Sequence, residues 1–104
     1  MQRYAFKMFL NPGQSAEYKR RHDEIWPKLS ALLTQVGIRN YSIFLDRETD
    51  TLFAYLERMV DHRMADLPDQ PVMREWWDYM KDIMDTHPDH SPVTHSLKEV
   101  FYLP

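Results

Sequence analysis

The residues of this chain best suited to chemistry begin with a tyrosine and a histidine that lie four positions apart. On a helix, this spacing places the rings of Tyr18 and His22 on one face, one turn from each other. A phenol beside an imidazole can hold a hydroxylated ligand and move its protons. The same pair can also be simple packing or part of a solvated helix face, and the spacing alone does not separate these interpretations.

Three further aromatic residues could share a pocket with that pair. If Tyr41 lies on the same strand face as Ile43 and Leu45, and helices cover that face, it points toward the first helix. Trp76 and Trp77 would lie about 100° apart on a helix, so at most one faces a pocket squarely while the other lines its rim. A tryptophan ring can stack on the C–H face of a sugar and donate its N–H. The two tryptophans could equally be core anchors.

Histidines and an aspartate gather near the C-terminus, and such residues can bind metal ions. They are His87, Asp89, His90 and His95. Their spacing matches no helical ligand pair, the chain has no cysteine, and neighbouring prolines indicate an extended loop that need not converge. The chain also has no Gly-rich phosphate loop, no G-x-S-x-G and no H-E-x-x-H motif. We therefore expect no metal site and no cofactor.

The composition is that of an ordinary globular domain, with 28% charged and 43% apolar residues. The length of 104 residues predicts a single domain over residues 1–104 with one modest core. A net charge of −3 argues against nucleic acid or an anionic membrane surface as a partner. Because there is no long apolar run, no signal-peptide layout and no cysteine, we expect a cytoplasmic protein.

The first part of the chain changes from a strand pattern to a helix pattern. Period-two alternation predicts a strand over Tyr4–Leu10, followed by a turn cluster. A helical pattern then covers Gln14–Val36. It must break near Trp26, because Pro27 lacks an amide hydrogen and suits the first position of a new helix. Gly37 stands where a left-handed helix terminator is required.

The remaining sequence predicts a hairpin, a second helical region and a last strand. The hairpin strands cover Ile38–Leu45 and Thr51–Arg58 and are joined by a polar turn. The helical region begins near Val60, is broken by two prolines, and has its longer segment over Val72–Met84. An irregular loop over residues 86–92 precedes a last strand over Ser96–Leu103.

The order strand, helix, strand, strand, helix, strand is that of the split βαβ, or ferredoxin-like, arrangement. We therefore predict an α+β fold of βαββαβ order, with an antiparallel sheet and helices on one face. The other face would carry Phe9, Phe44, Phe53 and Tyr55, which are too apolar to be left in water. A second copy packing sheet to sheet would cover them, so we expect a homodimer.

Four segments of the chain together resemble the L-rhamnose mutarotase family. They are Tyr18-Lys-Arg-Arg-His22-Asp-Glu-Ile-Trp-Pro27, Asn40-Tyr41 before an aliphatic strand, Trp76-Trp77-Asp-Tyr-Met80 and Val100-Phe-Tyr-Leu103. The similarity spans the whole chain. The H-x-x-I-W-P and W-W-x-Y-M segments are fairly specific in combination, whereas either segment alone would be weak.

The resemblance implies a ferredoxin-like dimer that interconverts the α and β anomers of L-rhamnose without a cofactor. It also implies that His22 is the proton donor and that Tyr18, Tyr41, Trp76 and Trp77 bind the sugar. We accordingly expect the tryptophan pair to include a platform on which the sugar stacks.

Proton transfer is all that this reaction requires. Mutarotation opens the sugar ring, lets the aldehyde rotate and closes the ring again, and one well-placed acid or base accelerates such steps roughly 10²–10⁴-fold. An unperturbed imidazole titrates near about 6.5 and a tyrosine near about 10, so imidazole alone both gives and accepts protons readily at neutral pH. We expect His22 to be the main general acid, and the sequence leaves the second proton-transfer group open.

Two other classes of function remain compatible with the same residues. One is a sugar-binding module that binds rhamnose without catalysis. The other is a small cofactor-free monooxygenase built on a dimeric ferredoxin-like scaffold. A binding module leaves anomer exchange at its spontaneous rate, and a monooxygenase consumes oxygen.

Overall fold

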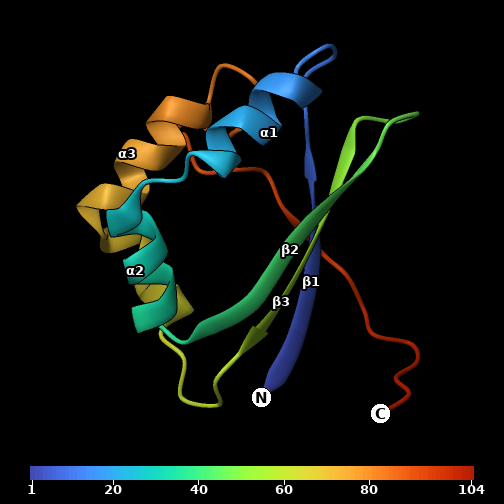
Figure 1. Ribbon diagram of the computed structural model, residues 1–104, viewed down its shortest axis with the longest axis vertical. Coiled ribbons are helices and arrows are strands. Elements are labelled where there is room, and N and C mark those ends of the chain that lie inside the picture. Colours follow the sequence, from blue (N-terminus) through green and yellow to red (C-terminus); the bar gives the residue numbers. More distant parts are fainter.

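The computed structural model describes residues 1–104 as a four-stranded antiparallel sheet with helices against one face (Figure 1). The elements are β1 (Gln2–Phe9), α1 (Ser15–Asp23), α2 (Pro27–Gln35), β2 (Ile38–Asp46), β3 (Thr51–Arg58), the 3-10 helix η1 (Met64–Asp69), α3 (Pro71–Met80) and β4 (His95–Ser96). The strands lie in the order β2-β3-β1-β4, each antiparallel to its neighbours. The predicted α+β class and antiparallel sheet are confirmed. None of the helices has the length and apolar character that crossing a bilayer requires.

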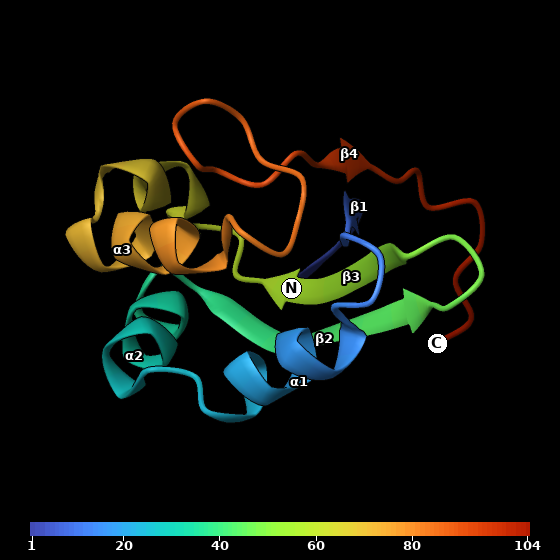
Figure 2. The ribbon, with the colours of Figure 1, turned by 90° about the horizontal axis from the view of Figure 1, so that it is seen from above.

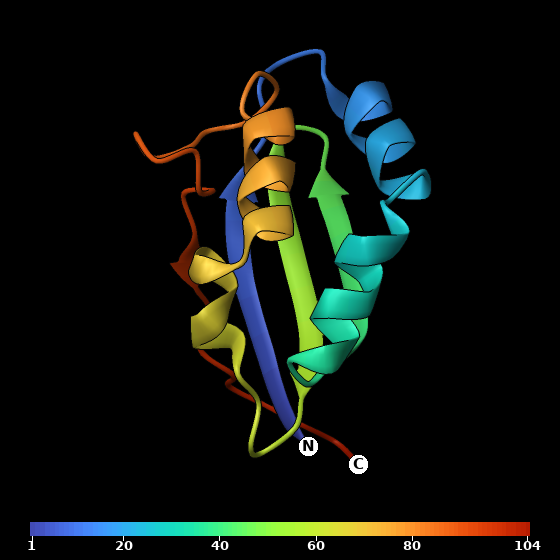
Figure 3. The same cartoon turned by 90° about the vertical axis from the view of Figure 1, so that its left-hand side faces the viewer.

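The helices form one layer over the sheet. Figure 3 shows α1 and α2 following each other along one side of this layer, with η1 and α3 along the other side. Figure 2 shows the segment after α3 returning to β4, at the edge of the sheet beside β1. The layer and the sheet enclose a core that includes Leu29, Leu52 and Leu56, each at most 2% exposed.

The break between α1 and α2 occurs where the proline predicts it. Trp26 has an extended backbone, with φ −63° and ψ 131°, and Pro27 takes the first position of α2. The Trp26 carbonyl accepts the amides of Leu29 and Ser30, both at 3.0 Å, so the new helix begins with its first hydrogen bonds in place. At the end of α2, Gly37 adopts φ +101°, as a left-handed terminator requires. The predicted break and terminator are both confirmed.

The second helical region differs from its prediction at both ends. Residues 60–61 form a turn, residues 62–63 are irregular, and helical structure begins only at Met64. At the other end α3 stops at Met80 instead of Met84. Ile83 and Met84 are nevertheless 2% and 5% exposed, because both belong to the core, and they pair with the residues that follow β1. The Asn11 amide donates to the Ile83 carbonyl at 2.9 Å, and Leu10 forms an isolated bridge with Met84. The apolar periodicity beyond Met80 therefore falls on a turn over residues 81–83 and on the bridge at Met84, not on a helix.

The last strand is much shorter than the predicted Ser96–Leu103. Only His95 and Ser96 pair with β1, opposite Lys7 and Phe6, and Leu97 adds one further amide bond to Ala5 at 2.9 Å. In this register residue 100 would face Gln2, where β1 begins. Residues 101–104 therefore lie beyond β1 and have no strand residue opposite them, and Phe101 is 76% exposed.

The sheet face opposite the helices is aromatic, as predicted. Phe44 and Phe53 are direct cross-strand neighbours on β2 and β3 and are 67% and 39% exposed. Phe9 and Tyr55 are partly buried. A pair of phenylalanine rings side by side in water is unfavourable for an isolated chain.

Candidate active site

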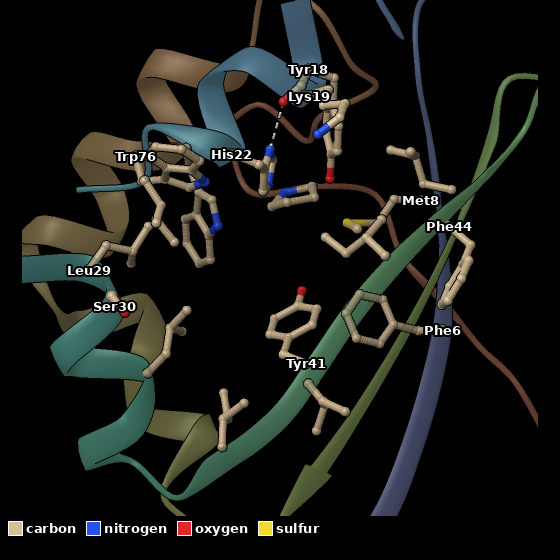
Figure 4. Close-up of a pocket in the computed structure, with 18 of the residues that line it drawn as sticks. Phe6, Met8, Tyr18, Lys19, His22, Leu29, Ser30, Tyr41, Phe44 and Trp76 are labelled. Atoms are coloured by element: carbon tan, nitrogen blue, oxygen red, sulfur yellow. Dashed lines mark hydrogen bonds between the residues drawn. The ribbon is translucent and has the colours of Figure 1, made fainter. Parts of the chain in front are cut away.

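A cavity of about 1520 Å³ lies between the helical layer and the sheet (Figure 4). Its walls come from the helices α1, α2, η1 and α3 and from strands β1, β2 and β3, together with Ser91, Pro92 and Thr94 from the segment before β4. All five residues that the sequence singled out line it: Tyr18, His22, Tyr41, Trp76 and Trp77. The cavity is ample for a monosaccharide, since pockets for small ligands measure roughly 300–1,000 Å³.

The ring of His22 is held in one orientation by its own helix. Its Nδ1 lies 2.9 Å from the backbone carbonyl oxygen of Tyr18, one turn earlier. A carbonyl can only accept a hydrogen bond, so Nδ1 carries the hydrogen in the neutral ring and Nε2 keeps a free lone pair. The Tyr18 ring stacks on the imidazole with the ring centroids 4.2 Å apart, which fixes the ring plane as well.

Burial favours the neutral form of His22. The pKa of His22 is lowered mainly because the half-buried ring has lost water that would stabilise its charge. The hydrogen bond to the Tyr18 carbonyl and the nearby charge of Asp23 oppose this change without reversing it. At neutral pH the imidazole is therefore a base that can accept a proton at Nε2 and return it as an acid.

Two tyrosine hydroxyls reach the cavity from different elements, Tyr18 from α1 and Tyr41 from β2. Burial raises the pKa of Tyr41 to about 12 and raises the pKa of Tyr18 as well, so both hydroxyls stay protonated and can donate hydrogen bonds. Figure 4 shows the Tyr41 hydroxyl pointing into the cavity, across from the wall that carries Tyr18 and His22. The Tyr41 side chain is 38% exposed because it borders this open space.

The two tryptophans of α3 differ in their surroundings. Trp76 is 6% exposed, and its ring lies edge-on to His22 at 5.3 Å and to Trp26 at 5.1 Å. Trp77 is only partly buried against the core and also borders the cavity. Trp76 thus lines the cavity from within the core, beside His22, and Trp77 has the more exposed ring.

Two residues behind the cavity were missed by the sequence reasoning. Trp26 stacks on Tyr79 with the centroids 5.6 Å apart, besides meeting Trp76. Arg21, only 8% exposed, donates through Nε to Glu17 at 2.7 Å and through Nη1 to the Tyr79 carbonyl at 2.7 Å.

The Arg21 guanidinium also binds the carboxylate of Asp82 with two hydrogen bonds of 2.8 and 3.1 Å. It therefore fastens α1, which carries His22, to the end of α3, which carries Trp76. Its spacing to Glu17 is visible in the sequence as a helical i, i+4 pair. The contact with Asp82, 61 residues later, has no local signal.

The C-terminal histidines do not form a cluster with ligand geometry. No three His, Asp or Glu side chains converge as a metal ion would require. His90 instead pairs through Nδ1 with Asp78 at 3.1 Å, and the His95 ring lies edge-on to Phe9 at 5.1 Å. These contacts fasten the C-terminal segment to α3 and to the sheet.

Comparison with known proteins gives consistent results along the whole chain. The sequence profile of the L-rhamnose mutarotase family matches residues 3–103. An L-rhamnose mutarotase from Rhizobium johnstonii is 59% identical over 104 residues, covering 100% of this chain and 98% of its own. Another, from Jannaschia sp., is 57% identical over 104 residues and covers both chains completely. The crystal structure of an L-rhamnose mutarotase from Formosa agariphila superposes with a TM-score of 0.94 at 48% identity, covering 100% of both chains.

Proposed function

Because this chain belongs to the L-rhamnose mutarotase family, we propose that its cavity is where the α and β anomers of L-rhamnose are interconverted. The family resemblance seen in the sequence is confirmed, and the activity is that of an isomerase. The geometry of His22 is the main support for this location. Its Nδ1 is held by the Tyr18 carbonyl, and its Nε2 is free beside a cavity that holds two tyrosine hydroxyls.

Ring opening in this site begins with neutral His22. Nε2 takes the proton of the anomeric hydroxyl while the ring oxygen gains a proton from a hydroxyl hydrogen-bonded to it, and the bond between C1 and the ring oxygen breaks. The open aldehyde rotates about the C1–C2 bond. Ring closure then runs these transfers in reverse on the other face of the aldehyde, with protonated His22 as the acid. Each proton that leaves one group arrives on another.

The other cavity residues hold the sugar during this exchange. The partly buried ring of Trp77 offers a flat face for the C–H side of the pyranose. The hydroxyls of Tyr18 and Tyr41, which remain protonated, donate hydrogen bonds to sugar oxygens. The Tyr18 hydroxyl, one helical turn from His22, is also available to protonate the ring oxygen.

Anomer-exchange NMR on purified protein tests the function. We expect exchange between the two anomer signals of L-rhamnose to be much faster with the protein than the spontaneous exchange in the same buffer. A binding module would bind rhamnose and leave the exchange rate unchanged. Oxygen consumption with an aromatic substrate, and no acceleration of exchange, would instead indicate a monooxygenase.

We also propose that two copies of this ferredoxin-like fold pack sheet to sheet. The support is the exposed aromatic pair Phe44 and Phe53, together with the exposed apolar residues Val100, Phe101 and Leu103 of the C-terminal segment. Burying such rings removes apolar area from water at about 25 cal/mol per Å².

Light scattering tests the dimer. At micromolar concentration we expect twice the mass of one chain, and Phe44→Lys should shift the mass toward that of a monomer because a charge would be buried at the interface. Ala31→Lys is the matched control, since Ala31 is exposed on α2, away from the sheet. A clean monomer mass for the unmodified chain would contradict the proposal.

A further inference from the structure

Strand β2 is irregular where its residues Asn40 and Tyr41 line the cavity. Arg39 pairs with Glu57 and Ser42 pairs with Tyr55, so two residues, Asn40 and Tyr41, stand opposite a single residue of β3. This is a β-bulge, an extra residue that bends the strand and increases its local twist. Asn40 has φ +50°, in the left-handed region that glycine and asparagine adopt most readily.

The bulge determines which way Tyr41 faces. In a regular strand alternate residues share a face, so an inward Ile38 would place Tyr41 on the outer face. In this chain Ile38 is 5% exposed in the core, and the Tyr41 ring nevertheless lies on the same inner side, edge-on to Phe6 at 6.5 Å. The extra residue therefore allows the strand to anchor at Ile38 and still direct the Tyr41 hydroxyl into the cavity (Figure 4).

The Asn40 side chain fastens the bulge to the neighbouring strand. Its Nδ2 donates to Oε1 of Glu57 at 3.2 Å, and the other oxygen of that carboxylate accepts the Tyr55 hydroxyl at 3.1 Å. Glu57 thus bridges β2 and β3 on the outer face, opposite the cavity. The backbone of Asn40 thus adopts the positive φ of the bulge, and its side chain bonds the bulge to β3.

We propose that Asn40 is a positioning residue, which acts through the bulge to aim the Tyr41 hydroxyl at the bound sugar. This inference rests on the proposed function and deepens it. Tyr41 donates its hydrogen bond to the sugar in the ground state and in the transition state alike, so loss of its aim weakens binding more than it slows proton transfer. Asn40 also lines the cavity, but its side-chain amide is bonded to Glu57, so we assign its effect to the aim of Tyr41.

The test compares variants of Asn40 with a matched residue elsewhere. Asn40→Val places a β-branched side chain at positive φ and should raise KM about 3- to 10-fold, the size of one lost hydrogen bond, with kcat within about 2-fold. Asn40→Gly accepts the same dihedral and should keep KM within about 2-fold. Asp50→Val is the control, because Asp50 has φ +54° in the hairpin turn, outside the cavity, and should affect stability without changing KM.

A double-mutant cycle with Tyr41→Phe separates positioning from a general structural effect. In the Tyr41→Phe background, Asn40→Val should change KM by less than about 2-fold, because the hydroxyl that the bulge positions is already absent. An unchanged KM in Asn40→Val, or an equal rise in the Tyr41→Phe background, overturns the assignment while the wild type remains an active mutarotase. A wild-type protein that leaves anomer exchange at its spontaneous rate overturns the proposed function, and the assignment with it.

Discussion

Replacing His22 with alanine is expected to lower the catalysed rate of anomer exchange by about 100-fold or more while the chain remains folded. The half-buried imidazole bonds only to its own helix carbonyl and contacts Tyr18 and Trp76 through its ring, so its loss removes the base without breaking an ion pair. His22→Asn fills part of the same space but cannot accept a proton near neutral pH. His87→Ala is the control, since His87 is exposed and outside the cavity.

The pH dependence of the wild type provides an independent measure of the same residue. Neutral His22 is the active base, and burial lowers its pKa below the ordinary value of histidine. The rate should therefore be constant around neutral pH and fall on acidification, through an apparent ionisation below about 6.5. Near-wild-type exchange in a folded His22→Ala protein would mean that a tyrosine or a bound water performs the proton transfer.

Trp76→Ala should primarily destabilise the fold. The side chain is 6% exposed and touches His22, Trp26 and Tyr79, so its removal empties a site in the aromatic core between α1 and α3. Losses of about 3–5 kcal/mol in the free energy of unfolding are typical of such large-to-small changes. Urea denaturation measures this loss directly.

Trp77→Ala is the matched comparison for Trp76, one position further along α3. Its ring is partly buried and borders the cavity, so the main effect should be weaker binding of L-rhamnose, with a smaller loss of stability. Titration of both variants with rhamnose distinguishes the two roles. If Trp76→Ala is as stable as wild type and binds rhamnose poorly, the roles of the two tryptophans are reversed.

Features with local causes were predictable from the sequence. Pro27 breaks the helix by its missing amide hydrogen, Gly37 supplies the positive φ at the helix end, and the bounds Thr51–Arg58 were predicted correctly because strand alternation is strong there. The meeting of Tyr18 with His22 follows from helical spacing alone. Their common cavity with Tyr41 followed from placing the helices on one face of the sheet.

Features that depend on distant partners were not predictable. The end of α3 coincides with the pairing of Ile83 with Asn11, and β4 pairs with β1 only at His95 and Ser96, although β1 itself extends to Gln2. A bidentate contact such as that between Arg21 and Asp82 exists only once α1 has packed against the turn that follows α3. The bulge at Asn40 is also invisible to a period-two pattern, since the pattern assumes the regular register that the bulge interrupts.

The inner position of β1 in the sheet determines when during folding the cavity can exist. β1 is the first element to be synthesised, yet its neighbours are β3 from the middle of the chain and β4 from near its end. Pairings between such distant segments close long loops and therefore form slowly. Because the cavity walls come from α1, β2, α3 and the segment before β4, a sugar can recognise only a nearly complete chain. Bound rhamnose would then protect the whole molecule from global unfolding and proteolysis, so substrate supply would govern the lifetime of the enzyme as well as its turnover.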